Sequence, residues 1–429
     1  MAQDTTAYND VLKTVYEGGI RELIPNNFPT LAMFEEKDAS PWGGKAVEYP
    51  VKVGRNQGSG WGSELGNIPT AGRQQYALTR IPMRYQYGRM SFSAQVMASS
   101  EGAKNAFAPA AEQETNGLVN DMRSARARMI FGDGRGVLAL VNGAASSTTQ
   151  TLDSPGGVAG ATNGNRFIAP GMQIAMVNPA TGLLRSTTFT ATVVTAPAAG
   201  TTITITPTQS TTDNDYVVRI AQIASTDVSD SSYQKEPVGL LGLVDDATYV
   251  ATLHNINRTT QPLWQSKVLA SVGALSADVL QRGVDLADEI GDGDITDLIM
   301  HHSLRRAYMS MMEGDRRYTG ADLSNPDAGT RAAKKQKLSF GGIPILVDKY
   351  APYATIFGID RSQLRRWVQK KGEWMDEDGS ILQRIGTGAT AQDAFEAIYR
   401  IWDNFSIEKP NTCFRLDGVT ATVVVAHID

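Results

Sequence analysis

Two runs of alternating apolar and polar residues, separated by a glycine-rich stretch, constrain the fold of this chain most strongly. The first run would place four apolar side chains on one face of a strand: Val47, Tyr49, Val51 and Val53. The second would do the same with Thr79, Ile81, Met83, Tyr85 and Tyr87. Residues 54–73 between the runs read GRNQGSGWGSELGNIPTAGR. The pattern therefore predicts a long hairpin with a flexible tip.

A hairpin of this kind needs a partner outside its own domain. Strands of some ten residues reach about 33 Å, and an isolated two-stranded ribbon is only marginally stable in water. We therefore expect the hairpin to dock on another subunit. Aromatic residues and arginine are enriched at the centres of interfaces, so the expected contact residues are Trp42, Arg55, Trp61 and Arg73.

Residues 109–131 form the longest helical pattern. Pro109 suits a first helical position, and Gly132 suits a left-handed residue just past the end. Glutamates in the first turns and arginines in the last ones, Arg123, Arg126 and Arg128, oppose the helix dipole. One face carries Ala111, Thr115, Leu118, Met122, Ala125 and Met129. We expect this face to lie on a sheet or on a neighbouring subunit.

Residues 144–232 differ in composition from the rest of the chain. They are rich in Ser, Thr, Gly and Ala, and no lysine occurs between Lys104 and Lys235. Strand patterns at 173–177, 184–194, 202–206 and 216–220, joined by turn clusters, predict a small sandwich or barrel inserted into a parent domain. We expect this module to face outward or to bridge neighbours. Deleting residues 146–231 should then leave the remaining domain folded.

The parent domain shows a mixed order of helices and strands. A helix should begin after Ser276 and end at Gly291, with Val279, Gly283, Leu286 and Ile290 on one face. Ser303 should begin a second helix, and strands are expected at 297–300, 343–348, 354–360, 395–405, 413–416 and 419–427. This order predicts an α+β domain with a mixed sheet.

Composition excludes several classes of protein. The chain has 429 residues, a formal charge of −5 and a pI of about 5.6, which disfavours a direct DNA or RNA reader. Its only cysteine, Cys413, excludes an intrachain disulfide framework. There is no basic segment followed by an apolar one at the N-terminus and no run of eighteen apolar residues. We therefore expect a protein that is neither exported nor membrane-spanning.

The sequence offers no convincing catalytic or metal site. Residues 132–136, GDGRG, follow a helix, whereas a phosphate loop follows a strand. His301 and His302 would point to opposite faces at a strand end, and residues 376–379 lack the closing acid of a calcium loop. We predict no enzyme activity, no cofactor, no metal and no catalytic residue. A carbohydrate-processing enzyme with a β-module would need a carboxylate pair that the sequence does not reveal.

The order of these parts resembles the major capsid (head) protein of tailed bacteriophages. The likeness covers nearly the whole chain and is carried by GKAVEYPVKV, EPVGLLGLVDD, LSFGGIPILVDKY, TIFGIDRSQL and AFEAIYRIWDNFSIEKPNTCFRLDGVTA. It implies the α+β capsid fold with an inserted small all-β domain. The implied parts are an N-terminal arm (1–42), an extended hairpin loop (43–93), a spine helix with the start of the peripheral domain (94–143), the inserted β-domain (144–232), a mainly axial domain (233–390) and return strands of the peripheral domain (391–429).

The resemblance also implies a function and its partners. Family members form pentamers and hexamers that close an icosahedral shell around double-stranded DNA, which they enclose without reading its sequence. The expected setting is the virion, assembled in the host bacterial cytoplasm with a portal protein and with room for a decoration protein. Because the chain starts at the arm with Met1, the scaffolding protein is expected to be separate. The alternative is an encapsulin-like compartment shell, which encloses enzymes and usually lacks a large inserted β-module.

Some relatives join subunits by an isopeptide bond between a lysine on the hairpin loop and an asparagine of a neighbour. Residues 54–73 contain Arg55 and Arg73 but no lysine. A guanidinium stays protonated and does not replace a neutral amine as the nucleophile. The resemblance, with this departure from it, predicts a shell held without covalent bonds.

Overall fold

The computed structural model describes residues 29–38, 46–95, 110–159, 163–185, 191–196, 200–220, 227–312, 338–376, 381–386 and 392–422. The chain divides into two compact units. The smaller unit comprises Met1–Asn26, Gln86–Arg123 and Gly372–Arg400, and the larger comprises Asn27–Tyr85, Ser124–Lys371 and Ile401–Asp429. Four long elements have residues in both: β4 (Arg84–Ser93), α2 (Ala110–Met129), β19 (Leu364–Trp374) and β21 (Ala394–Ile407).

In the smaller unit, α2 packs against β4 along the face that the sequence predicted. Leu118 and Met122 cover Gly88, where an added Cβ would lie 2.4 Å from the Met122 sulfur. This strand position therefore excludes any larger residue. β20 (Gln383–Arg384) pairs antiparallel with β21, and Met90, Phe92 and Ala397 form a small buried cluster. Pro109 and Ala111, the expected first residues of the helical pattern, lie where the structure describes no side chain.

The predicted apolar face of the second run is correct only as far as Met83. Thr79, Ile81 and Met83 are buried, but Tyr85 and Tyr87 are 49% and 59% exposed. The run is two strands, β3 (Gln75–Pro82) and β4, interrupted at Met83. A shift of one residue reverses the direction of every later side chain.

The end of α2 also differs from the prediction. Gly132 does not adopt the left-handed conformation, which Gly134 and Gly136 adopt instead, with φ of 88° and 76°. The Ile130 carbonyl accepts a hydrogen bond from the amide of Leu240, at the start of α3 (Leu240–Leu243). A segment more than a hundred residues later in the chain therefore donates a hydrogen bond to a backbone carbonyl at the end of the helix.

The Ser/Thr-rich region forms a closed six-stranded barrel. Its strands are β5 (Val137–Val141), β6 (Ala145–Asp153), β7 (Gln173–Val177), β8 (Ala191–Thr195), β9 (Thr202–Thr211) and β10 (Tyr216–Arg219), in the order β10-β5-β6-β9-β8-β7. The expected all-β module is thus a barrel. β6 was not predicted, because its sequence ASSTTQTLD is mostly polar. β5 joins the barrel although it precedes residue 144.

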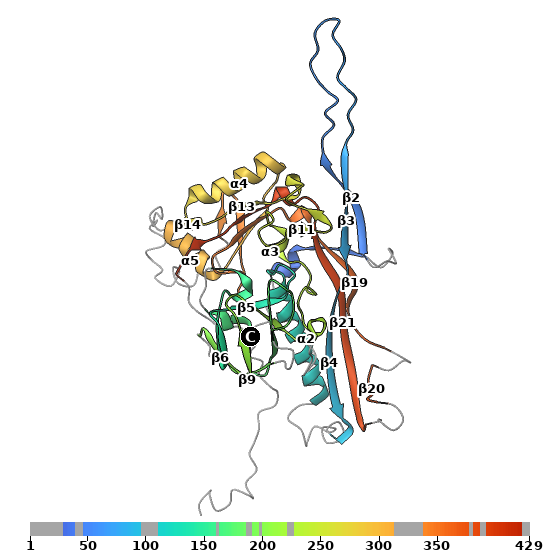
Figure 1. The fold of residues 1–429 in the computed structure, drawn as a ribbon, viewed down its shortest axis with the longest axis vertical. Coiled ribbons are helices and arrows are strands. Elements are labelled where there is room, and N and C mark those ends of the chain that lie inside the picture. Colours follow the sequence, from blue (N-terminus) through green and yellow to red (C-terminus); the bar gives the residue numbers. More distant parts are fainter. Residues whose placement is uncertain are drawn as a thin grey trace, which may run out of the picture. The chain divides into compact units, whose positions relative to one another are not determined.

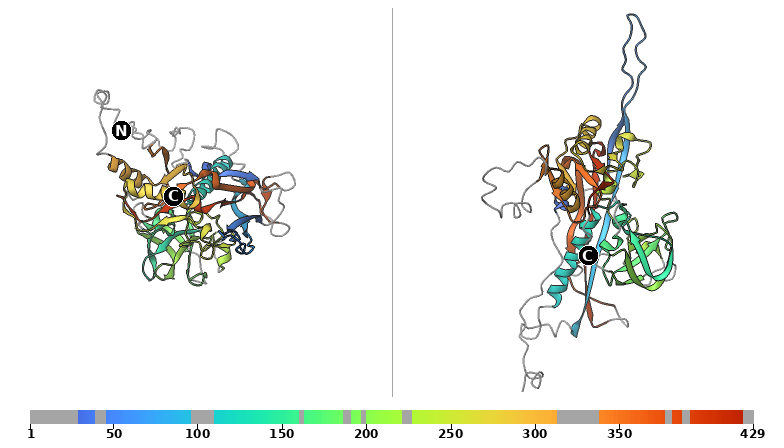
Figure 2. Two further views of the ribbon diagram at one scale, coloured as in Figure 1. Left: turned by 90° about the horizontal axis from the view of Figure 1, so that it is seen from above. Right: turned by 90° about the vertical axis from the view of Figure 1, so that its left-hand side faces the viewer.

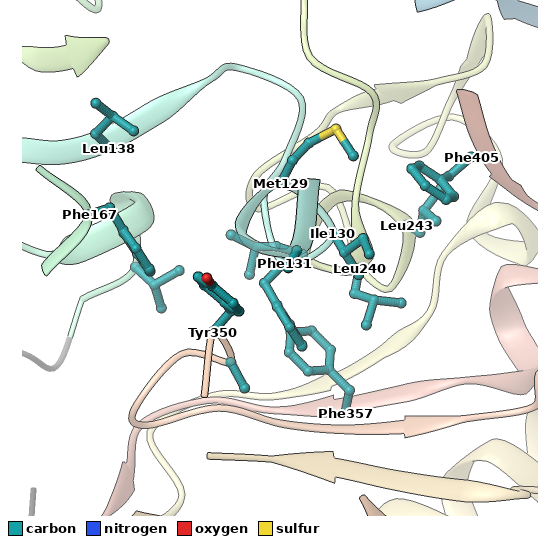
Figure 3. Packing of buried hydrophobic residues seen from close by; sticks show 14 of the residues in the cluster. Met129, Ile130, Phe131, Leu138, Phe167, Leu240, Leu243, Tyr350, Phe357 and Phe405 are labelled. Atoms are coloured by element: carbon teal, nitrogen blue, oxygen red, sulfur yellow. The ribbon is translucent and has the colours of Figure 1, made fainter. Parts of the chain in front are cut away.

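The barrel shares one hydrophobic core with the rest of the larger unit (Figure 3). Phe167 of the barrel stacks on Tyr350 with ring centroids 6.4 Å apart, and the Arg166 guanidinium lies 4.1 Å from the ring centroid of Tyr353. Arg166 also donates to the carbonyl of Ala351. Deleting residues 146–231 would uncover these apolar surfaces, so the packing argues against the independence that we expected of the module.

A six-stranded mixed sheet completes the larger unit. Its order is β13 (Lys267–Leu269), β22 (Phe414–Leu416), β18 (Ile356–Ile359), β15 (Asp297–Met300), β17 (Ile343–Val347) and β16 (Ser339–Phe340). β15 runs parallel to β17 and antiparallel to β18. α4 (Ala277–Gly291) lies across the sheet in Figure 1, and α5 (His302–Met311) follows β15.

α4 begins as predicted, because the Ser276 hydroxyl accepts from the amide of Val279. Its buried face is Leu280, Gly283 and Ala287, so the face predicted to end at Ile290 is wrong in detail, and Ile290 is 40% exposed. Gly283 and Gly358 leave room for the ring of Phe414 between them.

Apart from β2, a strand of nine residues, the remaining elements are short. They are η1 (Thr30–Met33), β1 (Glu35–Asp38), β2 (Ala46–Gly54), η3 (Pro155–Gly157), η4 (Gly164–Phe167), η5 (Val228–Asp230), β11 (Thr252–Leu253), β12 (Ile256–Asn257), η6 (Pro262–Trp264), β14 (Gly273–Ala274), η8 (Arg361–Gln363), η10 (Pro410–Thr412) and β23 (Val419–Thr420). β1 pairs in parallel with β19, Glu35 opposite Arg365.

We expect two histidines, the buried His254 and the half-buried His301, to make the fold sensitive to acid. His301 directly follows β15, at a strand end as expected, and caps α5 by accepting from the amide of Ser303, with its ring edge-on to Tyr353. The rings of His301 and His302 lie 5.5 Å apart, so the expectation that they point to opposite faces is wrong. His254 lies in the turn between β11 and β12. Burial lowers the pKa of His254 from 6.5 to about 3 and the pKa of His301 from 6.5 to about 2.

We therefore expect the folded protein to lose stability already at pH values above the folded pKa values of these histidines. Between pH 6.5 and the folded pKa values the unfolded chain binds the protons and the folded chain does not, so stability falls as the pH falls. From pH 7 to pH 4.5 we expect a loss of about 2 to 3 kcal/mol through each histidine. Urea unfolding of the parent and of a His254→Asn variant at both pH values measures the difference. Equal pH dependence in the two proteins would contradict the assignment.

Candidate intersubunit surface

The predicted hairpin is present, and its two strands pair over almost their full length. β2 and β3 run antiparallel, with Val47 opposite Ile81 and Lys52 opposite Tyr76. On the inner face Val47 and Ile81 are buried with Met83 and Trp367. Val47, Tyr49, Val51 and Val53 share one face, as predicted, but at the base this face packs on the chain's own Trp367, and Tyr49 and Val51 are only partly buried.

Hydrogen bonds fix the base of the hairpin to the rest of the larger unit. The amide of Arg80 donates to the carbonyl of His254, 2.9 Å away, in the β11–β12 turn. Asn404 Nδ2 donates to the carbonyl of Pro82 at 2.7 Å. The Trp367 indole, which packs under the hairpin, donates to Ser406 Oγ at 2.9 Å. The hairpin is thus held along its β3 strand.

The tip, residues 55–74, projects from the base (Figures 1 and 2). Trp61, Leu65 and Ile68 are 105%, 103% and 90% exposed. The two arms of the tip approach closely, because a Cβ on Gly58 would lie 2.6 Å from the amide nitrogen of Gly72. Large exposed apolar side chains on a projection are a feature that interaction sites share.

The outer face of the strands continues this apolar surface toward the base. Tyr76 and Leu78 are 67% and 50% exposed, and Leu78 lies opposite Pro50. Closer to the body Glu48 and Arg80 form an ion pair of 3.4 Å on the exposed face. The surface available to a partner therefore combines an apolar centre with charged residues at its end.

Solved structures share this architecture. The capsid asymmetric unit of cyanophage A-1(L) matches 97% of this chain and 100% of its own with a TM-score of 0.59 at 10% identity. The capsid of the native GTA particle matches 98% of this chain and 100% of its own with a TM-score of 0.53 at 12% identity. This chain has the fold of the tailed-phage major capsid proteins. No family model matches the sequence, and no curated protein matches it either.

On this capsid fold the structure places three of the four predicted contact residues on the tip. Arg55, Trp61 and Arg73 are exposed there, and neither arginine forms an ion pair with any residue that the structure describes. Trp42 lies outside the described residues. Sequence reasoning missed Leu65, Ile68, Tyr76 and Leu78. These four residues could have been found from the sequence, because they are large apolar residues at positions of the hairpin that face away from the core.

A chain of ion pairs, buried at Asp403 and exposed at Lys371, links α2, β21, β19 and β1. Asp403, 1% exposed, accepts from Arg126 of α2 and from Arg366 Nε at 2.7 Å. Arg366 also bonds Glu36 of β1 at 2.6 Å, and Glu36 continues to Lys371 at 2.8 Å. These contacts lower the pKa of Glu36, chiefly through the hydrogen bond from Lys371. Arg126 lies in the last turn of α2, as predicted, but it is buried and paired.

The capsid fold shows no alternative site among the residues described. No group of three His, Cys, Asp or Glu side chains there is placed to hold a metal ion. No helix in those segments is both long enough and apolar enough to cross a bilayer. Cys413 is fully buried, and burial raises the pKa of its thiol to about 11, which leaves it unreactive at neutral pH.

Proposed function

We propose that this chain is the major capsid protein of a tailed bacteriophage. In this proposal it assembles as pentamers and hexamers into an icosahedral shell that encloses double-stranded DNA without reading its sequence. The observation that carries the proposal is a projecting hairpin with exposed Trp61, Leu65 and Ile68 on a capsid fold. A monomer gains nothing from exposing such a surface, whereas a shell buries it between copies.

The same proposal covers location and partners. The chain would act in the virion after assembly in the bacterial cytoplasm, with a separate scaffolding protein, a portal protein and space for a decoration protein. The division of the chain into arm, hairpin loop, spine helix, inserted β-domain, axial domain and return strands also belongs to it.

Isolation of native particles tests the proposal. Closed shells that contain double-stranded DNA would support a phage head. Closed shells that contain a cargo enzyme and no DNA would favour an encapsulin-like compartment instead. A chain that stays monomeric at high concentration, with or without scaffolding protein, would contradict both.

Within this proposal the contacts between copies are non-covalent. Arg55 and Arg73 contribute charge-assisted contacts, Trp42 and Trp61 contribute packing, and no lysine in residues 54–73 offers a nucleophilic amine. Mature particles boiled in detergent should therefore give a single band near 46.2 kDa on a denaturing gel. A ladder of covalent multimers would contradict this prediction.

A further inference from the structure

The connection between the projecting hairpin and the body is a break in the strand at Met83. β3 ends at Pro82 and β4 begins at Arg84, and the alternation of side chains changes there. Pro82, the last residue of β3, has no amide hydrogen, so its backbone offers only a carbonyl for hydrogen bonding. A break of this kind would let the hairpin swing relative to the strand that carries it.

Asn404 of β21 occupies this break. Its side chain is 1% exposed, and its Nδ2 donates to the carbonyl of Pro82 at 2.7 Å. Its Oδ1 accepts from the amide of Phe405 at 2.8 Å. One buried amide group thus supplies both a donor and an acceptor where the strand is interrupted.

Asn404 supplies the side-chain hydrogen bond to the last residue of β3, whereas Arg84, the first residue of β4, donates to the carbonyl of Gln234 at 2.8 Å. The next backbone bond along β3, from Arg80 to the carbonyl of His254, lies two residues further into the hairpin. Met83 packs against Val47 and Trp367. Such apolar contacts are non-directional. A hydrogen bond is directional and therefore fixes an angle.

We propose that Asn404 is the positioning residue that fixes the angle at which the β2–β3 hairpin leaves the body, and that this angle sets the curvature of the assembled shell. The claim about shell curvature rests on the proposed function. The claim about the hairpin angle concerns the free subunit alone. Within the subunit Asn404 acts on the hairpin through its hydrogen bond to the Pro82 carbonyl.

Distance measurements between spin labels on free, full-length subunits test this proposal. Labels are attached through Lys52→Cys on the paired strand β2 and Asp285→Cys on α4, both exposed positions, while the native Cys413 is buried and does not react. The parent should give one narrow distance. In Asn404→Asp a carboxylate faces the Pro82 carbonyl, so we expect loss of the narrow peak and a shift to a broad distribution. If the Asp variant does not fold, Asn404→Leu, which adds no charge, is measured in its place, and the same broad distribution is expected.

Asn163→Asp is the matched control. Asn163 is 2% exposed and its Nδ2 donates to the Tyr353 hydroxyl at 3.0 Å, far along the chain from the hairpin. This variant should lose thermal stability as the Asn404 variants do, yet keep the narrow distance. A narrow distance in both Asn404 variants, or equal broadening in the control, would overturn the role of Asn404. Particles of uniform diameter from an Asn404 variant with a broadened distance would overturn the link to curvature.

Discussion

Replacing residues 55–74 with an Asn-Gly turn is expected to give a folded monomer that no longer forms shells. Gly54 and Gln75 are the last paired residues of the two strands, so a two-residue turn can join them. The hydrogen bonds of the tip that the structure gives, from Gly58 to Asn56 and from Gly66 to Ser63, stay within the tip. The thermal midpoint should therefore change little, while sedimentation should show loss of assembled particles.

A variant that keeps the length of the tip separates side-chain contacts from the loop itself. Trp61→Ser, Leu65→Ser and Ile68→Ser together remove the large exposed apolar groups of the tip. Burial of each against a neighbour contributes about 1.5 to 3 kcal/mol, so the concentration needed for assembly should rise about 100-fold or more. Normal assembly by either variant would show that the tip is not a contact surface.

Asp403→Asn is expected to cause the largest loss of stability of any single substitution considered for this chain. The carboxylate accepts from Arg126 and Arg366, whose exposed fractions are 3% and 9%. Removing its charge takes away the carboxylate that the two buried guanidinium groups share, which costs about 3 to 5 kcal/mol. Urea unfolding at neutral pH measures the change in the free energy of unfolding.

Glu408→Gln provides the comparison for Asp403. Glu408 pairs with Arg365 at 3.0 Å, but its side chain is 39% exposed. Solvent screens such a pair, so its loss should cost less than about 1 kcal/mol. If the two substitutions lowered the free energy of unfolding by similar amounts, burial would not explain the contribution of Asp403.

Local pattern was sufficient for much of the fold. The alternation of β2, the long helix α2, the cap at Ser276 and the strand Asp297–Met300 all follow from residues close in sequence. The hairpin was predicted because a glycine-rich sequence lies between two alternating runs, and β2 and β3 pair as expected. These features depend on periodicity and turn chemistry, which a single sequence reveals.

The features that the sequence did not reveal depend on residues far apart in the chain. Nothing local to Met83 shows that the alternation changes there, since both sides of the break alternate correctly. The burial of Arg126 depends on Asp403, and the end of α2 depends on Leu240. The contact of Phe167 with Tyr350 joins the barrel to a core that no local pattern predicts. Asn404 looks like an ordinary strand residue until Pro82 lies beside it.

Electron cryomicroscopy of particles assembled from the purified chain, with scaffolding protein where assembly requires it, tests the central claim most directly. The account predicts closed shells with icosahedral symmetry, in which the tip of each hairpin lies on another copy and Trp61 is buried at that contact. Hairpins folded back on their own subunits, or shells in which Trp61 remains in solvent, would contradict it.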